Sequence, residues 1–331
     1  MKRGKKLLLL LAVLVILVAA VLIVLRLDPE GADTEEEDTG VSVFTLDPET
    51  VTELRWTYED EALTFVKSDG VWTYAEDSAF PLEESYLTAM LTVLSDVTAG
   101  KTIESPEDLA QYGLEGPACT VTVAADTEKE LLIGDETGIG GERYLSVGDG
   151  NVYLVDEGIL DSFSYGLLDL VAKEAIPDMT NVTSLEVASE VQSYTLSYAA
   201  ADAEDDSEEK VPVWFWNGDS GLPLDTALTE ALVQAVTGMS WGACVDYAAA
   251  GSLADYGLDA PTLTVTVNYT ETEDGESSAS FVLEIGDYVD GSCYARIAGS
   301  DLVYWIDGSI GDSLMSAVYD DLSAETARAE E

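Results

Sequence analysis

"YGLEGP" at Tyr112–Pro117 and "YGLDAP" at Tyr256–Pro261 are nearly the same six residues, about 144 positions apart. Each of them precedes a stretch typical of a β-strand, "ACTVTV" in the first case and "TLTVTV" in the second. Gly113 and Gly257 stand where a helix ends in the left-handed conformation, which glycine adopts without strain. The phrase therefore predicts a helix stop followed by a strand, made in the same way twice.

The residues around each glycine support this interpretation. Leu114 and Leu258 can fold back onto the last turn of the preceding helix, a contact that often accompanies such a stop. Pro117 and Pro261 prevent the helix from resuming, because proline has no backbone N–H to donate. We therefore interpret Gly113, Pro117, Gly257 and Pro261 as structural residues and not as catalytic ones.

Short helices are expected just before the two stops, in "SPEDLAQ" and "SLAD". Ser105 is the predicted N-cap of the first helix, with Pro106 at its first helical position. Ser252 is the predicted N-cap of the second, with Asp255 three residues later.

Strand and turn patterns on the N-terminal side of each stop also occur twice. Val51–Tyr58 is followed by "ALTFVKSDGVWTYA", in which a Ser-Asp-Gly turn separates two alternating runs, as in a β-hairpin. Val182–Ser189 is followed by "VQSYTLSYAA" and "VPVWFWN", with the acidic insertion Asp202–Lys210 between these two strands. Insertions of this kind are tolerated at hairpin tips.

A helix follows the hairpin in each copy, in "PLEESYLTAMLTVLSDV" and in "PLDTALTEALVQAVTGM". Asp225 is the expected N-cap of the second helix. Apolar residues that recur at helical spacing and should face the sheet are Leu87, Leu91 and Leu94 in the first helix, and Leu228, Leu232 and Val236 in the second.

The two copies also end alike, in "LLIGDETGIGGERYLSVGDGNVYLVDEGILDSF" and "LEIGDYVDGSCYARIAGSDLVYWIDGSIGDSL". Each ending predicts two hairpins and a closing helix. We therefore expect an α+β fold in tandem duplicate, with a mostly antiparallel sheet and packed helices in each copy. The first copy is assigned to residues 43–176 and the second to residues 177–322.

The N-terminal region differs from the rest of the chain. Residues 1–6 form a basic tail, and residues 7–25 are an uninterrupted apolar run, about 28 Å long as a helix and so long enough to span a bilayer. Residues 26–42 predict an acidic, extended tether. The basic flank before the apolar run predicts a single-pass anchor, with the N-terminus in the cytoplasm and the body outside.

A cleaved signal peptide is the alternative interpretation, with Val18 and Ala20 as the small residues before the cleavage site. The mature protein would then be secreted, and it would begin with the exposed apolar stretch "VLIVLRL". At the other end of the chain, residues 323–331 predict an acidic tail.

Charge narrows the possible partners. The chain has a formal net charge of −51, and beyond residue 27 nine basic residues face all 65 acidic ones. Such a surface repels phosphate backbones, so a nucleic-acid partner is not expected. The acidic loops at Asp202–Glu209 and Glu271–Glu276 could gather divalent cations loosely, although solvated loop tips explain them as well.

The side chains needed for several kinds of catalysis are missing from the sequence. "GDSG" at Gly218–Gly221 and "GDSL" at Gly311–Leu314 resemble nucleophile motifs, but these chemistries use a histidine and the chain has none. "DSG" at Asp219–Gly221 has no matching motif in the first copy, "GIGGER" at Gly138–Arg143 lacks the last glycine of a dinucleotide fingerprint, and "DGNVYL" at Asp149–Leu154 lacks the glycine of a calcium loop. We expect no enzyme, no cofactor and no metal site, with a carboxylate-dependent hydrolase as the remaining catalytic alternative.

Cysteine chemistry is not expected either. Cys119, Cys244 and Cys293 show no metal-ligand spacing, and three cysteines permit at most one internal disulfide. Cys119 and Cys293 fall in predicted strands and should behave as small buried apolar residues.

Aromatic residues form the one candidate ligand face. Trp72 and Tyr74 lie on the same face of a predicted strand, and Trp214 and Trp216 do so in the second copy. Such a strip could stack against the sugars of a cell-wall glycan. Packing between sheet and helix is the competing use, and it is favoured because both copies keep the strip.

The repeated stretches "VTELRW" and "VTSLEV", Trp72 and Trp214 after a turn, the two helix stops, and "LLIGD" and "LEIGD" together resemble the domain of unknown function 4340 family of bacterial proteins. The resemblance covers roughly Phe44 to Leu322. It implies an envelope-anchored protein that accompanies an ABC-type export system, including those linked to gliding motility, and it implies no catalytic residues. The sequence thus predicts a non-catalytic accessory protein of the cell envelope, and a cell-wall glycan-binding module is the alternative.

Overall fold

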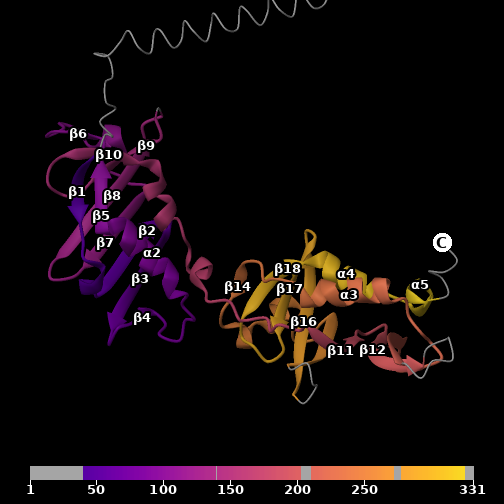
Figure 1. Ribbon diagram of the computed structural model, residues 1–331. Coiled ribbons are helices and arrows are strands. Elements are labelled where there is room, and N and C mark those ends of the chain that lie inside the picture. Colours follow the sequence, from indigo (N-terminus) through magenta and orange to yellow (C-terminus); the bar gives the residue numbers. More distant parts are fainter. Residues whose placement is uncertain (1–39, 139, 203–209, 272–276, 325–331) are drawn as a thin grey trace, which may run out of the picture. The chain divides into compact units, whose positions relative to one another are not determined.

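The computed structural model describes residues 40–138, 140–202, 210–271 and 277–324. The structure contains two eight-stranded sheets, one formed by the indigo to magenta strands of Figure 1 and one by the later strands up to yellow. Neighbouring strands run antiparallel in both sheets. The expected antiparallel sheet in tandem duplicate is therefore confirmed.

The first sheet has the strand order β4-β3-β2-β7-β8-β9-β10-β6. The bounds of its strands are β2 Glu53–Tyr58, β3 Glu61–Ser68, β4 Val71–Tyr74, β6 Lys101–Ile103, β7 Cys119–Ala124, β8 Glu128–Glu136, β9 Glu142–Ser146 and β10 Val152–Asp156. A separate two-stranded sheet pairs β1, Val41–Thr45, with β5, Asp96–Ala99.

The second sheet has the order β13-β12-β11-β15-β16-β17-β18-β14, which repeats the first order strand for strand. The bounds of its strands are β11 Asn181–Ala188, β12 Ser193–Asp202, β13 Lys210–Trp216, β14 Cys244–Asp246, β15 Leu263–Thr270, β16 Ser278–Val289, β17 Ser292–Ile297 and β18 Val303–Asp307. The duplication therefore extends to the topology of the sheets.

Alternation along the strands explains why the sheets form where they do. In β15 every second residue is buried, beginning with Leu263 and continuing through Val265 and Val267. Between β3 and β4, Asp69 and Gly70 have φ values of +54° and +85°, as a type I′ hairpin turn requires. The predicted Ser-Asp-Gly hairpin is confirmed.

The two predicted helices are present as α2, Glu84–Ser95, and α3, Thr226–Thr237. In α2 the three expected leucines are buried. In α3 the prediction was partly wrong, because Leu228 is 44% exposed and the buried residues are Thr229, Val233 and Val236. Asp225 caps α3 as expected, since its carboxylate accepts from the backbone N–H of Leu228 at 2.9 Å.

The closing helices differ between the copies. The second copy ends in α4, Gly308–Ser316, and α5, Tyr319–Leu322. α3 contacts β13 and α4, and α4 contacts β17 and β18 (Figure 1). The first copy has three 3-10 turns at this place, Glu157–Ile159, Asp161–Phe163 and Leu167–Leu170, so the expectation of a closing helix was wrong there.

The helices before the two stops are shorter than expected. Each is a single 3-10 segment, Ala110–Tyr112 in the first copy and Leu253–Tyr256 in the second. Ser105 is not an N-cap, because the first segment begins five residues later after Leu109. Ser252 does precede the second segment, but its hydroxyl donates to the Asp246 carboxylate at 3.0 Å and caps nothing.

Several predictions fall outside the described residues. These are the anchor at residues 7–25, most of the tether at residues 26–42, most of both acidic loops and residues 325–331 of the tail. In the ranges that are described, no helix is long and apolar enough to cross a bilayer.

Candidate functional sites

The first helix stop forms a complete Schellman motif. Gly113 has φ +69° and ψ +17°, its N–H donates to the Ala110 carbonyl at 3.1 Å, and the Leu114 N–H donates to the Leu109 carbonyl at 3.2 Å. These two hydrogen bonds satisfy carbonyl groups that the end of a helix otherwise leaves free. Leu114 is buried, as the motif predicts.

The second stop has the same hydrogen bonds. Gly257 has φ +66°, its N–H donates to the Ala254 carbonyl at 3.4 Å, and the Leu258 N–H donates to the Leu253 carbonyl at 2.8 Å. Leu258 is also buried. The predicted role of the two glycines as left-handed helix stops is confirmed.

Each stop docks onto a β-bulge in the adjacent strand of its own sheet. The pairing of β8 with β9 shifts register between Ile133 and Glu136, and that of β16 with β17 shifts between Ile285 and Tyr288. The glycine of "LLIGD" or "LEIGD" lies inside each shift. The two motifs that the copies share therefore meet in space.

Close backbone approach explains why both motifs contain glycine. A Cβ on Gly134 would overlap the carbonyl oxygen of Tyr112, and a Cβ on Gly113 would lie 2.8 Å from the backbone nitrogen of Asp135. Gly286 and Gly257 are enclosed in the same way in the second copy. The repeated phrase is one half of an interlocking contact, and its function is architectural.

The tyrosine of each phrase completes the contact. Tyr112 meets Tyr144 of β9 edge to face, with ring centroids 4.9 Å apart, and Tyr256 meets Tyr294 of β17 at 5.1 Å. Sequence reasoning missed this pairing, although both partners follow the bulge at corresponding places in the two endings. Pro117 and Pro261 lie between the stop and the next strand, where the chain needs no N–H donor.

Arg143 of β9 is a second residue that sequence reasoning missed. Its guanidinium group is buried, and it donates to the Gly134 carbonyl at 2.6 Å and to the Glu136 carboxylate at 2.7 Å. Cys293 stands at the corresponding place in β17, one residue before the paired tyrosine. A charged residue and a thiol therefore fill equivalent positions, which no periodic pattern could indicate.

The aromatic strip of the first copy is buried. Trp72 and Tyr74 are each 6% exposed, and Tyr74 packs against Phe65 with ring centroids 5.3 Å apart. Lys67 Nζ lies 5.6 Å from the centroid of the Trp72 ring. These two rings therefore offer no free face to a sugar.

The strip of the second copy is less uniform. Trp214 is 3% exposed and lies against Tyr198, with ring centroids 5.0 Å apart and ring planes inclined by 50°. Trp216 is half-buried and stacks on Tyr194 at 4.7 Å, with Tyr319 of α5 near its edge. Packing accounts for these contacts, and only Trp216 keeps part of its ring accessible.

The three cysteines are free and buried, so no disulfide links them. Burial raises the pKa of the Cys119 thiol and of the Cys293 thiol to about 12. Such thiols stay protonated near neutral pH, which makes them poor nucleophiles there.

The remaining sequence motifs are turns or packing contacts. The Asp219 carboxylate accepts from the Gly221 N–H at 2.8 Å, which closes a turn, and the Ser313 hydroxyl of "GDSL" donates to the Ser309 carbonyl within α4. Asp149 accepts from the Tyr153 hydroxyl at 2.5 Å, and this bond lowers the pKa of Asp149. Within the described part of the chain, no three acidic or cysteine side chains gather as metal ligands would.

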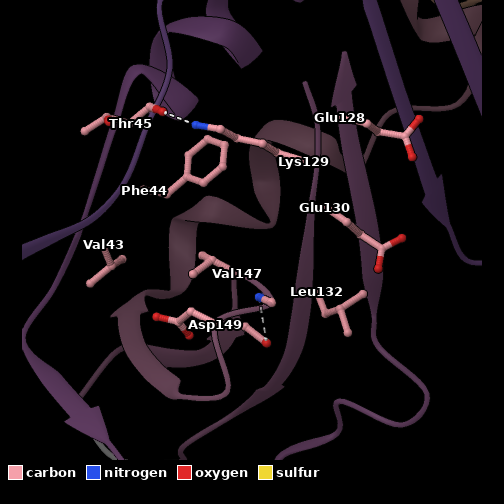
Figure 2. A pocket seen from close by; sticks show the side chains of 11 residues that line it. Val43, Phe44, Thr45, Glu128, Lys129, Glu130, Leu132, Val147 and Asp149 are labelled. Atoms are coloured by element: carbon pink, nitrogen blue, oxygen red, sulfur yellow. Dashed lines mark hydrogen bonds between the residues drawn. The ribbon is translucent and has the colours of Figure 1, made fainter. Parts of the chain in front are cut away.

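One groove in the first copy has a volume of about 500 Å³. It is lined by β1, by β8 and by the turn that connects β9 to β10. Figure 2 shows the Lys129 ammonium group beside Phe44, where it donates to the Thr45 carbonyl at 3.0 Å. Its Nζ also lies 4.9 Å from the centroid of the Phe44 ring. The Lys129 ammonium group is therefore held by contacts with Thr45 and Phe44.

A second groove, of about 580 Å³, lies between α3 and the second sheet. Its helix wall includes Glu230, Gln234 and Thr237, which share one face of α3, and its sheet wall includes Tyr198 and Trp214. The Trp214 Nε1–H is buried and has no acceptor among the described residues. Among the residues that the structure describes, those lining this groove include one carboxylate and no lysine or arginine.

Comparisons with other proteins identify the family alone. No curated protein and no solved structure matches the chain. The model of a domain of unknown function, DUF4340, matches residues 72–213 and again residues 214–322. The two matches begin at Trp72 and Trp214, at corresponding places in β4 and β13. Because these matches cover most of the sequence, the chain belongs to the DUF4340 family, and it contains the family's domain twice.

Proposed function

We propose that this protein is a non-catalytic accessory subunit of a cell-envelope system, either an ABC-type exporter or a gliding-type system. Residues 7–25 anchor it in the cell membrane, with the N-terminus in the cytoplasm and the body outside. The observation that carries the proposal is the use of the duplicated motifs. Both copies use Tyr-Gly-Leu and Ile-Gly-Asp to join a helix stop to a β-bulge.

Charge supports a protein partner over a nucleic acid. The chain beyond residue 27 carries nine basic and 65 acidic residues, which favours basic or neutral partner surfaces. A two-domain body without histidine suits a role in binding and spacing better than one in acid–base chemistry.

Crosslinking in native membranes tests the partner. The full-length chain is expected to recover the subunits of one transporter reproducibly, and a chain without residues 1–26 is expected to lose them. Recovery of wall fragments without any membrane protein would instead favour the glycan-binding alternative. The Trp216→Ala variant would then be compared with the unaltered chain on glycan arrays.

Topology can be tested separately with a single reporter thiol. The three native cysteines are buried, whereas Val191 in the β11–β12 turn is 88% exposed. A membrane-impermeant maleimide should therefore label Val191→Cys in intact spheroplasts and leave the unaltered protein unlabelled. Labelling only after lysis would place the body in the cytoplasm, and labelled protein free in the medium would indicate cleavage and secretion.

A further inference from the structure

The outer hairpins of the two copies differ at one pair of facing residues. In the first copy Lys67 of β3 lies opposite Trp72 of β4, and in the second copy Tyr198 of β12 lies opposite Trp214 of β13. The Lys67 ammonium group lies 5.6 Å from the centroid of the Trp72 ring, a distance at which a cation is attracted to the ring face. The first copy therefore supplies its own cation to this tryptophan, and the second copy supplies a neutral ring.

The helices that follow these hairpins in the chain, α2 and α3, also differ at one corresponding residue. Their buried stripes give the correspondence, because Leu87, Leu91 and Leu94 of α2 match Thr229, Val233 and Val236 of α3. The residue after the first of these is Thr88 in α2 and Glu230 in α3. The first copy thus combines a lysine with a threonine, and the second combines a tyrosine with a glutamate.

The groove of the second copy therefore has two features that attract a cation, and none of its described lining residues is a lysine or an arginine. Tyr198 is 41% exposed and lies beside Trp214, with ring centroids 5.0 Å apart. Glu230 contributes a carboxylate from the helix wall. The volume of about 580 Å³ lies within the range of small-molecule sites.

We propose that this groove binds an organic ammonium group, which supplies the cation that Lys67 supplies in the first copy. Tyr198 supplies the exposed aromatic surface, backed by the buried Trp214, and Glu230 supplies the opposite charge. The ammonium group belongs either to a free small molecule or to a lysine side chain of a partner, and the two sources present the same chemistry. The proposal does not depend on the accessory role proposed above.

The test is a titration of the full-length chain in a non-ionic detergent, at constant ionic strength. The indole N–H signals of the six tryptophans are followed by NMR, and Trp214→Phe identifies the signal of Trp214. Choline is the charged probe, and 3,3-dimethyl-1-butanol is its neutral counterpart of the same shape. Choline is expected to shift the Trp214 signal saturably, and the neutral alcohol is expected to leave it unchanged.

Charge-matched variants separate this site from the general attraction of an acidic surface. Glu230→Gln should weaken choline binding at least about fivefold, whereas Glu190→Gln, in an exposed turn, should change it less than about twofold. Tyr198→Lys should abolish binding, because the introduced ammonium group fills the position as Lys67 does in the first copy. Equal effects of the two glutamine variants would overturn the proposal, and so would the absence of a saturable choline shift.

The two sources are distinguished by a second titration with Nα-acetyl-lysine methylamide. Tighter binding of the lysine derivative than of choline assigns the ammonium group to a partner's side chain. Tighter binding of choline assigns it to a free small molecule. Equal shifts with choline and with 3,3-dimethyl-1-butanol would show that charge has no part in recognition, and they would also overturn the proposal.

Discussion

Gly113 and Gly134 are both crowded at the same contact, but only Gly113 also has a left-handed backbone. At Gly134 the space needed by the Tyr112 carbonyl is the reason for glycine. Gly134→Ala should lower the free energy of unfolding by about 3 kcal/mol or more, because the atom that obstructs the new methyl group is backbone and has little freedom to move. Urea unfolding followed by circular dichroism measures the change.

Gly70→Ala is the matched control, because it introduces a methyl group at a left-handed glycine that has no close neighbours. Gly70 has φ +85°, and no atom lies within 4 Å of a Cβ built there. Its replacement should cost only about 1 kcal/mol, the penalty of a left-handed alanine. If Gly134→Ala costs no more than Gly70→Ala, the interlocking contact does not hold the stop on the bulge.

Tyr288 and Tyr194 form a second comparison between single residues. The Tyr288 hydroxyl is buried with no hydrogen-bond partner in the described part of the chain, whereas the Tyr194 hydroxyl donates to the Leu314 carbonyl at 2.8 Å. Tyr288→Phe should be neutral or stabilise by up to about 1 kcal/mol, because it removes an unsatisfied buried group. Tyr194→Phe should destabilise by about 1–2 kcal/mol, since it leaves a carbonyl unpaired. Equal losses in the two variants would contradict this account.

At the scale of the element, two glycines of α4 allow this helix to pack closely on the second sheet. A Cβ on Gly311 would overlap the Tyr288 hydroxyl, and a Cβ on Gly308 would lie 2.7 Å from the Gly291 carbonyl oxygen. The "GDSL" string therefore packs against the sheet. Its Gly311 is needed because a larger residue would collide with Tyr288, and its serine imposes no such requirement.

A double-mutant cycle tests the contact between Gly311 and Tyr288. Gly311→Ala alone should destabilise by about 2–4 kcal/mol, because the methyl group displaces the helix or the tyrosine. In the Tyr288→Phe background the loss should shrink by about 1 kcal/mol or more, since the nearest obstructing atom is gone. Additive effects in thermal unfolding would show that the two residues do not meet.

The helices also show where sequence patterns stop being informative. Helical spacing predicted the buried face of α2 correctly, but in α3 it selected Leu228, which is exposed, and missed Thr229, which is fully buried. The Thr229 hydroxyl donates to the Asp225 carbonyl at 2.7 Å, so it can be buried without an unpaired polar group. Apolar periodicity cannot identify a buried residue whose polarity is satisfied within its own helix.

At the scale of the whole molecule, buried weak acids predict sensitivity to alkali. Burial raises the pKa of Tyr288 and of Tyr304 to about 12, from 10.0, and that of Cys293 to about 12, from 9.0. The folded protein keeps these protons at a pH where the unfolded chain has lost them. Stability should therefore be complete below about pH 9 and should fall as the pH rises towards about 12, by ~1.4 kcal/mol per group and pH unit.

Urea midpoints measured at intervals from pH 8 to pH 11 check this prediction. Tyr288→Phe removes one of the groups, so its stability should fall less steeply than that of the unaltered protein. A free energy of unfolding that stays constant from pH 9 to pH 11 would contradict the pKa shifts.

The sequence by itself determined the duplication, the antiparallel hairpins and the left-handed glycines. Each of these depends on local chemistry, namely alternation along a strand and the conformational freedom of Gly113 and Gly257. Contacts between distant residues were decided by the tertiary structure alone. The docking of each stop on a bulge, the burial of Trp72 and Trp214, and the groove beside Glu230 depend on which strands become neighbours, and no local pattern encodes that choice.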